Sequence, residues 1–106
     1  MIERTIPTVL VGGNFKGAVA IDAMSRMIKG SVIKLQREPD NPADARAVAC
    51  YFRDVHVGYI PRQTNPRIAE ALDRGAPVNC TVAAPPVIKG SRVVVEPKLT
   101  VSYWQS

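Results

Sequence analysis

The chain alternates apolar and polar residues over several short segments, a pattern typical of β-strands with one buried face. In one of them, Cys80 and Val82 flank the polar Thr81. Segments of this kind predict seven strands: Thr8–Gly12, Ser31–Arg37, Ala47–Phe52, His56–Pro61, Val78–Ala83, Arg92–Glu96 and Leu99–Trp104. Seven short strands in about 100 residues favour a closed or nearly closed barrel, because closure removes exposed strand edges.

A first helix is predicted between residues 19 and 29. Ile21, Met24 and Ile28 follow the i, i+3, i+7 spacing of one helix face. Gly30 can end this helix, because glycine accepts the left-handed conformation of a C-terminal cap.

A second helix is predicted to begin at Asn65, which can cap it, with Pro66 at its first position. Ile68 and Leu72 share the side that faces the core, and Gly75 ends the helix. Both helices are short and amphipathic, so we expect them to cover an open end or an edge of the barrel.

Length and charge limit the possible roles. A chain of 106 residues forms a single domain, residues 1–106, that is large enough to fold without a metal or a disulfide. Its 14 Lys and Arg residues outnumber its 9 Asp and Glu residues, which gives a net charge of +5. A small basic domain attracts polyanions such as nucleic acid. Charge alone leaves other roles open.

No segment has the pattern of a targeting or membrane sequence. The first apolar run is broken by Glu3 and Pro7 and is too short for a signal peptide. The run 82–88 contains Pro85 and Pro86, which a membrane-spanning helix would not accommodate. We therefore expect a soluble, cytoplasmic protein that does not bind membranes.

Catalytic and metal-binding patterns are weak. The single histidine, His56, has no nucleophile motif beside it, and the chain has no glycine-rich phosphate loop. A zinc site would need Cys50, His56 and Cys80 with a carboxylate, but there is no C-x-x-C pair. The two cysteines fall on the apolar phase of predicted strands, as buried free thiols do. We predict no enzymatic activity, no metal and no cofactor.

Hydrogen-bonding side chains gather at predicted strand ends in the segment 35–62. Asn41 and Asp44 follow one strand, beside two prolines, and either residue type can simply cap a turn there. A carboxylate repels phosphate. An acidic residue on a basic binding face is therefore useful where it accepts a hydrogen bond from a hydroxyl or a base amine. A terminal 3′-hydroxyl is such a donor.

Tyr59 and Arg62 lie three residues apart at the end of a later strand. Pro61 fixes the backbone between them, so the Arg62 guanidinium projects from a stiff corner and suits a phosphate. Tyr59 is placed to stack on a nucleotide or to hydrogen-bond to it. The alternative is a surface arginine beside a half-buried tyrosine. Lys16 and Arg37 are weaker candidates for phosphate contacts.

Four segments in the same order resemble the HIRAN domain. This small β-barrel module is fused to helicase-like remodelling and repair ATPases and also occurs as a free-standing bacterial protein, the type that this chain resembles. The segments are Val9-Leu10-Val11-Gly12 with Phe15 and Gly17, then Leu35–Val48 with its Arg37-Glu38-Pro39-Asp40-Asn41-Pro42, then Val57–Arg62, then Ile68–Leu72. The resemblance spans roughly residues 8–104. With the strand pattern, it implies a mostly β fold: a small OB-like β-barrel of about six or seven strands with two short helices.

The resemblance also implies roles for particular residues. The residues of HIRAN domains that match Asn41 and Asp44 are implicated in holding the 3′ end of single-stranded DNA. Phe15 is similar to an aromatic residue that packs against the end nucleotide, with a position in the core as the alternative. Together with the residue-level arguments, this gives seven candidate nucleic-acid-binding residues: Phe15, Lys16, Arg37, Asn41, Asp44, Tyr59 and Arg62.

The chain departs from the family pattern in two places. Better-studied eukaryotic members carry an Arg-Tyr pair before the aromatic matched by Phe15, where this chain has Gly13-Asn14. They also carry a tyrosine before the key aspartate, where this chain has Ala43. Since stacking on an aromatic side chain contributes about 1–3 kcal/mol per base, we expect weaker binding of a DNA end than in those members, or a different ligand.

The sequence thus predicts a non-catalytic nucleic-acid-binding module for single-stranded DNA or its 3′-hydroxyl end. By analogy with the family, it would act in DNA repair or replication-fork processing, with a helicase or nuclease as a possible partner. The alternative is an adaptor for protein–protein interaction. Such an adaptor would recruit a DNA-processing enzyme through an exposed strand edge or the end of the chain near Trp104.

Overall fold

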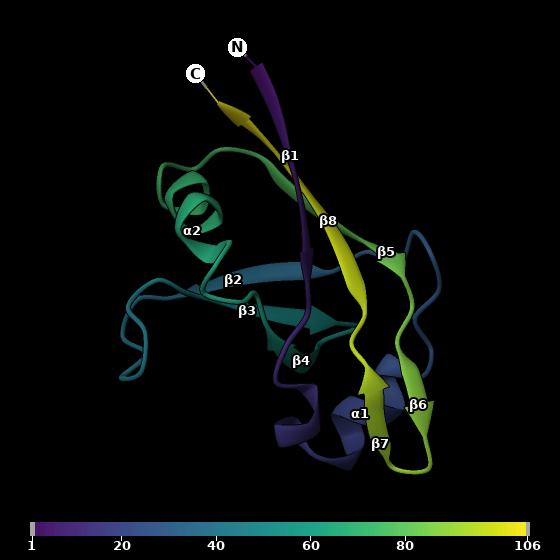
Figure 1. The fold of residues 1–106 in the computed structure, drawn as a ribbon. Helices are drawn as coiled ribbons and strands as arrows, with labels where there is room; N and C mark the ends of the chain where they lie inside the picture. The colour runs from purple at the N-terminus through teal and green to yellow at the C-terminus, as the bar shows by residue number, and fades with distance from the viewer. Residues whose placement is uncertain (1, 106) are drawn as a thin grey trace.

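The computed structural model describes residues 2–105, and β-strands dominate it (Figure 1). In chain order the elements are β1 (Ile2–Val9), a 3-10 helix η1 (Gly13–Lys16), α1 (Ala18–Met24), β2 (Lys34–Glu38), β3 (Ala47–Phe52), β4 (Val55–Tyr59), α2 (Asn65–Asp73), β5 (Val78–Ala84), β6 (Val87–Lys89), β7 (Arg92–Val95) and β8 (Lys98–Gln105). A mostly β fold with two α-helices is therefore confirmed.

The strands form three separate antiparallel sheets, in the orders β1-β8-β5, β2-β3-β4 and β6-β7. In Figure 1 the strands of the second sheet run across those of the first. Isolated bridges, Val11 with Tyr59 and Val32 with Thr81, link the sheets. The predicted closed, OB-like barrel is not confirmed, because no continuous ladder joins the three sheets within the described residues.

β5 and β8 extend into the smaller hairpin formed by β6 and β7. Pro85 and Pro86 separate β5 from β6, since proline has no N–H to donate to a strand ladder. Pro97 lies between β7 and β8 and separates the two strands. Its carbonyl accepts a hydrogen bond from the Leu10 N–H at 3.0 Å. The sequence prediction missed β6, which has three residues and little alternation.

β1 begins six residues earlier than predicted. The expected strand was 8–12, whereas β1 pairs with β8 from Ile2 to Val9 and only Val11 continues as an isolated bridge. β1 is the edge of its sheet, and among its residues only Ile6 is buried. An exposed edge strand needs no alternation of apolar residues, so its sequence carries a weak strand signal.

The helix boundaries also differ from the prediction. α1 ends at Met24, well before the expected residue 29, with Ser25 as its C-cap. Met27 turns back into the core, but Ile28, which was expected on the buried face, is exposed. In α2 the cap is Thr64, one residue before the expected Asn65.

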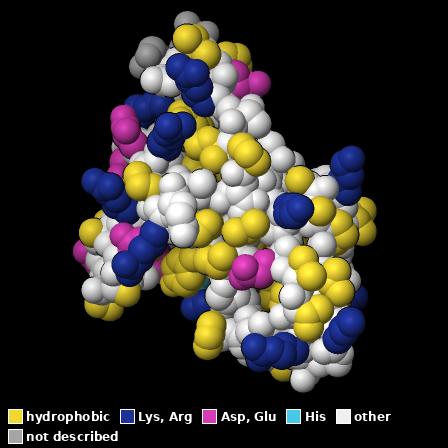
Figure 2. Space-filling view, viewed as in Figure 1, with side chains coloured by type: hydrophobic (Ala, Val, Ile, Leu, Met, Phe, Trp, Pro, Cys, Tyr) yellow, Lys and Arg dark blue, Asp and Glu magenta, His cyan; other side chains and the backbone are white. Residues whose placement is uncertain are grey.

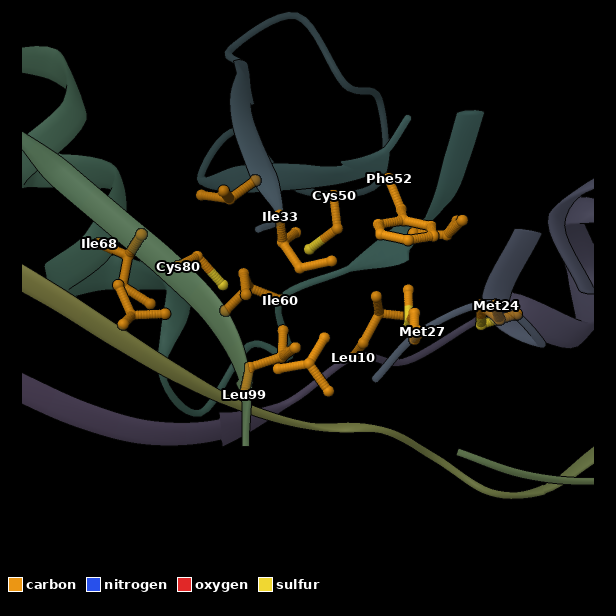
Figure 3. Packing of buried hydrophobic residues seen from close by; sticks show 14 of the residues in the cluster. Leu10, Met24, Met27, Ile33, Cys50, Phe52, Ile60, Ile68, Cys80 and Leu99 are labelled. Carbon is orange, nitrogen blue, oxygen red and sulfur yellow. The ribbon is translucent and has the colours of Figure 1, made fainter. Parts of the chain in front are cut away.

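The core lies where the two larger sheets face each other, and one cluster of apolar side chains fills it (Figure 3). Ile68 from α2 and Met24 from α1 are fully buried in this cluster. Cys50 from β3 and Cys80 from β5 are free and buried, which confirms the expected burial of both thiols. Within residues 2–105 no helix has the length and apolar character needed to cross a membrane.

Candidate functional site

Four of the seven candidate residues line one open pocket of about 230 Å³, here called the end pocket. Asn41 and Asp44 come from the loop between β2 and β3, Tyr59 from the end of β4, and Arg62 from the segment that leads to α2. The other residues of its lining are Val11, Ala43, Ala47, Ile60, Pro61 and Asn65. The end pocket therefore combines an apolar surface with polar and charged groups, as ligand sites do.

Asp44 is held in place by hydrogen bonds to both carboxylate oxygens. Its Oδ1 accepts from the Arg46 N–H at 2.9 Å, and its Oδ2 accepts from the Asn65 amide at 2.8 Å. The hydrogen bonds from Arg46 and Asn65, with the charge of Arg62, lower the pKa of Asp44. Because each oxygen of an ionised carboxylate can accept two hydrogen bonds, Asp44 keeps free acceptor capacity toward the end pocket.

Asn41, Glu38 and Tyr59 form a second hydrogen-bonded group. The Asn41 Oδ1 accepts from the Ala43 N–H at 2.9 Å and closes the loop. Glu38 Oε1 accepts from the Asn41 amide at 3.0 Å and from the Tyr59 hydroxyl at 2.9 Å. Burial alone would raise the pKa of Glu38, but these two hydrogen bonds together with the charges of His56 and Lys16 outweigh burial, and the pKa is lowered. Glu38 is therefore an ionised anchor at neutral pH.

Arg62 is the most accessible cation of the end pocket. Its terminal nitrogen donates to the Ala43 carbonyl at 2.7 Å, and its Nε lies 3.7 Å from Asp44 Oδ2. The side chain is 72% exposed, whereas that of Asp44 is 22% exposed. Since a guanidinium has five N–H donors, most of the donors of Arg62 remain available to a ligand.

An aromatic group adjoins the end pocket and was not predicted. The His56 ring stacks on Tyr51, with centroids 4.9 Å apart, and meets Tyr59 edge-on at the same separation. The Lys16 ammonium lies 4.9 Å above the Tyr59 ring, a cation–π geometry. Burial and the charge of Lys16 lower the pKa of His56, which favours the neutral ring.

A β-bulge explains why this group was missed. In a regular strand His56 and Tyr59 would point to opposite faces, because they are three residues apart. The register between β3 and β4 shifts after Cys50, so Gly58 pairs with Cys50 while His56 pairs with Tyr51. The extra residue, Val57, returns His56 to the side of Tyr59.

The other three candidates, Phe15, Lys16 and Arg37, lie outside the lining of the end pocket. Phe15, on η1, is 92% exposed, which rules out the core position considered for it. Arg37 forms an ion pair with Asp73 at 2.9 Å and donates to the carbonyls of Ala45 and Ala47. Most of its donors are thus occupied at the junction of β2 and α2, which leaves little for a phosphate.

Sequence reasoning missed two polar residues of the site. Asn65 was assigned to a helix cap, yet it is buried and donates to Asp44. Glu38 is the last residue of β2, directly before the loop. This position at a strand end is the one sequence signal that could have identified it. Within residues 2–105 no group of three or more His, Cys, Asp or Glu side chains could hold a metal ion.

Comparison with known proteins identifies the family. The HIRAN domain family model matches residues 10–96. The chain belongs to the HIRAN family. This HIRAN match includes every residue that lines the end pocket and leaves all of β1 and β8 outside it.

Two crystal structures share the fold. The HIRAN domain of human HLTF has a TM-score of 0.69 at 18% sequence identity, over 94% of this chain and 74% of that one. A protein from Lactobacillus plantarum has a TM-score of 0.74 at 19% identity, over 96% of this chain and 97% of that one. A search of curated proteins found no match. At these identities the two structures support the fold, and the chemistry of the site rests on its own residues.

Proposed function

We propose that this HIRAN chain is a non-catalytic nucleic-acid-binding module whose end pocket takes the 3′-hydroxyl end of single-stranded DNA. Membership of the HIRAN family supports nucleic-acid binding. The observation that carries the finer proposal is that Asn41, Asp44, Tyr59 and Arg62 line one open pocket. A role in DNA repair or fork processing, beside a helicase or nuclease, belongs to the same proposal.

The geometry suits a strand end that carries a hydroxyl. Asp44 is ionised and fixed by Arg46 and Asn65, so it presents acceptors without reorganisation. A 3′-hydroxyl donates to such an acceptor, and Arg62 lies close enough to bind the preceding phosphate. The apolar lining and the Tyr59 ring provide a surface for the terminal sugar and base.

The test compares single strands that end in a 3′-hydroxyl with the same strands ending in a 3′-phosphate. The phosphate removes the donor and places negative charge beside Asp44. The loss of a hydrogen bond to a charged group costs about 1.5–3 kcal/mol, so affinity measured by fluorescence anisotropy should fall at least about tenfold. Changing the 5′ terminus between hydroxyl and phosphate is the matched control and should have little effect.

Two variants locate the effect. Asp44→Asn removes the repulsion and keeps an acceptor, so the difference between the two 3′ ends should narrow. The new amide would face the Asn65 amide, so circular dichroism must first show that this variant is folded. Arg62→Ala should weaken binding and reduce the salt slope by about 0.7, the loss of one phosphate contact. Equal binding of both 3′ ends by the unmodified protein would reject end recognition.

A further inference from the structure

A second polar hollow is lined by residues of α2, β1 and β8 and holds several arginines. Arg4 on β1 and Arg67 and Arg74 on α2 line a hollow of about 560 Å³. Arg67 also lines an adjoining hollow of about 360 Å³ together with Arg46. These four arginines and the surface between them are here called the arginine groove. In Figure 2, Lys and Arg side chains gather at the upper left, over α2 and the nearby ends of β1 and β8, with acidic side chains among them.

The arginine groove carries an excess of positive charge, although the carboxylates Glu70 and Asp73 line its smaller hollow. Elsewhere in residues 2–105 three arginines pair with carboxylates: Arg26 with Asp22, Arg37 with Asp73 and Arg62 with Asp44. No such ion pair involves the four arginines of the groove within the described chain. Arg4 donates to the Gln105 side chain and Arg74 to the Trp104 carbonyl, contacts that leave both charges unneutralised.

The arrangement does not follow from helix periodicity alone. Arg67, Glu70 and Arg74 are spaced i, i+3, i+7 and share one helix face. Arg4, however, comes from a strand more than sixty residues away in the sequence and lines the same hollow. Glu70 is the one carboxylate in the lining of that hollow, so the positive charges outnumber the negative by three to one.

Some residues that line the arginine groove are direct sequence neighbours of residues that line the end pocket. Asn65 lines the end pocket, and the next residue, Pro66, lines the hollow that Arg46 and Arg67 share. We propose that the arginine groove binds the backbone phosphates of the nucleic-acid strand whose 3′ end occupies the end pocket. This inference rests on the proposed function of the end pocket.

The chemistry of the lining favours a nucleic acid over an acidic protein. Apart from Tyr103, the larger hollow is lined by charged and amide side chains: Arg4, Arg67, Glu70, Arg74 and Gln105. Protein interfaces have an apolar core and are depleted of charge there, whereas nucleic-acid interfaces are polar and strongly positive. A guanidinium also matches a phosphate through two parallel hydrogen bonds.

The length of α2 sets the length of strand that can be bound. Arg67 and Arg74 are seven residues apart, which corresponds to about 10 Å along the helix. Since the phosphates of one strand follow each other at about 3.4 Å along the duplex axis, and further apart in an extended strand, the groove accommodates about two to three phosphates. Affinity should therefore rise with strand length until the strand reaches along the whole groove, and then level off.

The experiment measures DNA affinity against salt concentration for strands of three and twelve nucleotides. The groove variant Arg67→Gln with Arg74→Gln is compared with Lys89→Gln with Arg92→Gln, which removes the same charge from the β6–β7 hairpin. For the longer strand the groove variant should lose about 1.4 from the salt slope, or about 0.7 per contact. The three-nucleotide strand should bind the groove variant with nearly the same affinity as the unmodified protein.

Several outcomes would overturn the proposal. One is an unchanged salt slope in the groove variant, and another is an equal loss in the hairpin control. Arg67→Gln alone removes a side chain that forms no hydrogen bond or ion pair within residues 2–105. This single variant therefore guards against a folding defect caused by the loss of the Arg74 bond to Trp104. Polyglutamate of matched charge is a third arm. If it binds as tightly as DNA and with the same dependence on Arg67 and Arg74, the groove is a site for acidic protein instead.

The arms also separate this inference from the proposed function. If 3′-hydroxyl and 3′-phosphate strands bind equally, but the groove variant still loses its salt slope on the longer strand, end recognition fails and the groove stands as a backbone-binding surface. If the two 3′ ends differ and the groove variant behaves like the unmodified protein, the end pocket stands and the groove proposal fails.

Discussion

At the scale of single residues, the shape of the end pocket depends on Glu38. Its carboxylate accepts from Asn41 in the loop and from Tyr59 on β4, and so ties the two sides of the pocket together. The positive charge of Lys16 lies close enough to Glu38 to help keep this carboxylate ionised.

The pKa of Tyr59 reports on its hydrogen bond to Glu38. Burial raises the pKa of Tyr59 to about 12, and the hydrogen bond to Glu38 and the charge of Glu38 act in the same direction. Glu38→Gln removes that charge, so the Tyr59 pKa should fall back toward its ordinary value of 10.0. An absorbance titration of the phenolate, with Tyr59→Phe to assign the highest transition, measures the change. An unaltered transition in Glu38→Gln would contradict the contact.

The same shift predicts how stability depends on alkaline pH. The folded state holds the Tyr59 proton more tightly than the unfolded chain does. This interaction therefore stabilises the fold fully below pH 10, and the contribution is lost as the pH rises through about 12. Denaturant unfolding in Tyr59→Phe should accordingly show a weaker fall in the free energy of unfolding over that range.

Sequence reasoning identified the ligand-facing residues of the end pocket better than the residues that hold them. Asn41, Asp44, Tyr59 and Arg62 stand beside prolines or at strand ends, where local sequence signals are strong. Glu38 and Asn65 each hold a residue that is 21 positions away in the sequence, Tyr59 and Asp44 respectively. Contacts of this kind depend on how the elements pack, so no local sequence pattern predicts them.

At the scale of elements, β4 carries Tyr59 of the end pocket, and Gly58 makes the position of Tyr59 possible. The Tyr59 N–H donates to the Val11 carbonyl at 2.9 Å, and the Val11 N–H donates back to Tyr59 at the same distance. Gly58 has a φ of +151°, and a Cβ at that position would overlap the Val11 carbonyl oxygen and lie 2.7 Å from Leu10 Cδ2. Only glycine allows the two backbones to approach so closely.

Gly58→Ala should therefore destabilise the protein strongly. Overpacking costs about 1–3 kcal/mol, and the backbone conformation adds about 1–3 kcal/mol, so we expect the free energy of unfolding to fall by about 3 kcal/mol or more. Gly90→Ala is the matched control. Gly90 also has a positive φ, but its added Cβ would meet open space, so only about 1–2 kcal/mol should be lost. Equal losses in chemical denaturation would show that the Val11 contact is unimportant.

Element boundaries show where local pattern stops being informative. The apolar spacing of residues 19–29 continues past Met24, but Ser25 caps the helix and Met27 reaches the core from a turn. Met24 and Met27 are thus both buried, although the helix does not continue to Met27. Apolar periodicity therefore predicted which residues of the segment pack, with the exception of Ile28, and overestimated the length of the helix.

At the scale of the whole molecule, strand number alone does not determine closure. The sequence correctly predicted most strands and both helices, but a barrel also needs each strand to pair with its neighbours along a continuous ladder. Here the prolines at 85, 86 and 97 and the bulge in β4 interrupt pairing, and the strands remain in three sheets. The two larger sheets are held together by the side chains packed between them.

The reactivity of Cys50 and Cys80 can show whether the packing between the two larger sheets opens. They come from different sheets, and 0% and 2% of their surfaces are exposed. Burial raises the pKa of Cys50 well above its ordinary range and that of Cys80 to about 12, which further suppresses the reactive thiolate. A thiol reagent should reach either one only when the two sheets separate.

We therefore expect both thiols to react together, at a rate set by global unfolding. For a domain stable by at least about 5 kcal/mol, the reaction should be slowed at least about a thousandfold relative to the unfolded chain. If Gly58→Ala removes about 3 kcal/mol, it should accelerate both reactions by about a hundredfold, since each 1.4 kcal/mol is a factor of ten. A chelator should leave the melting temperature unchanged, and a clear fall in the melting temperature would reveal a bound metal.

Rapid labelling of one cysteine in the native protein would contradict the prediction that both thiols react together. It would mean that the two sheets open locally, without global unfolding.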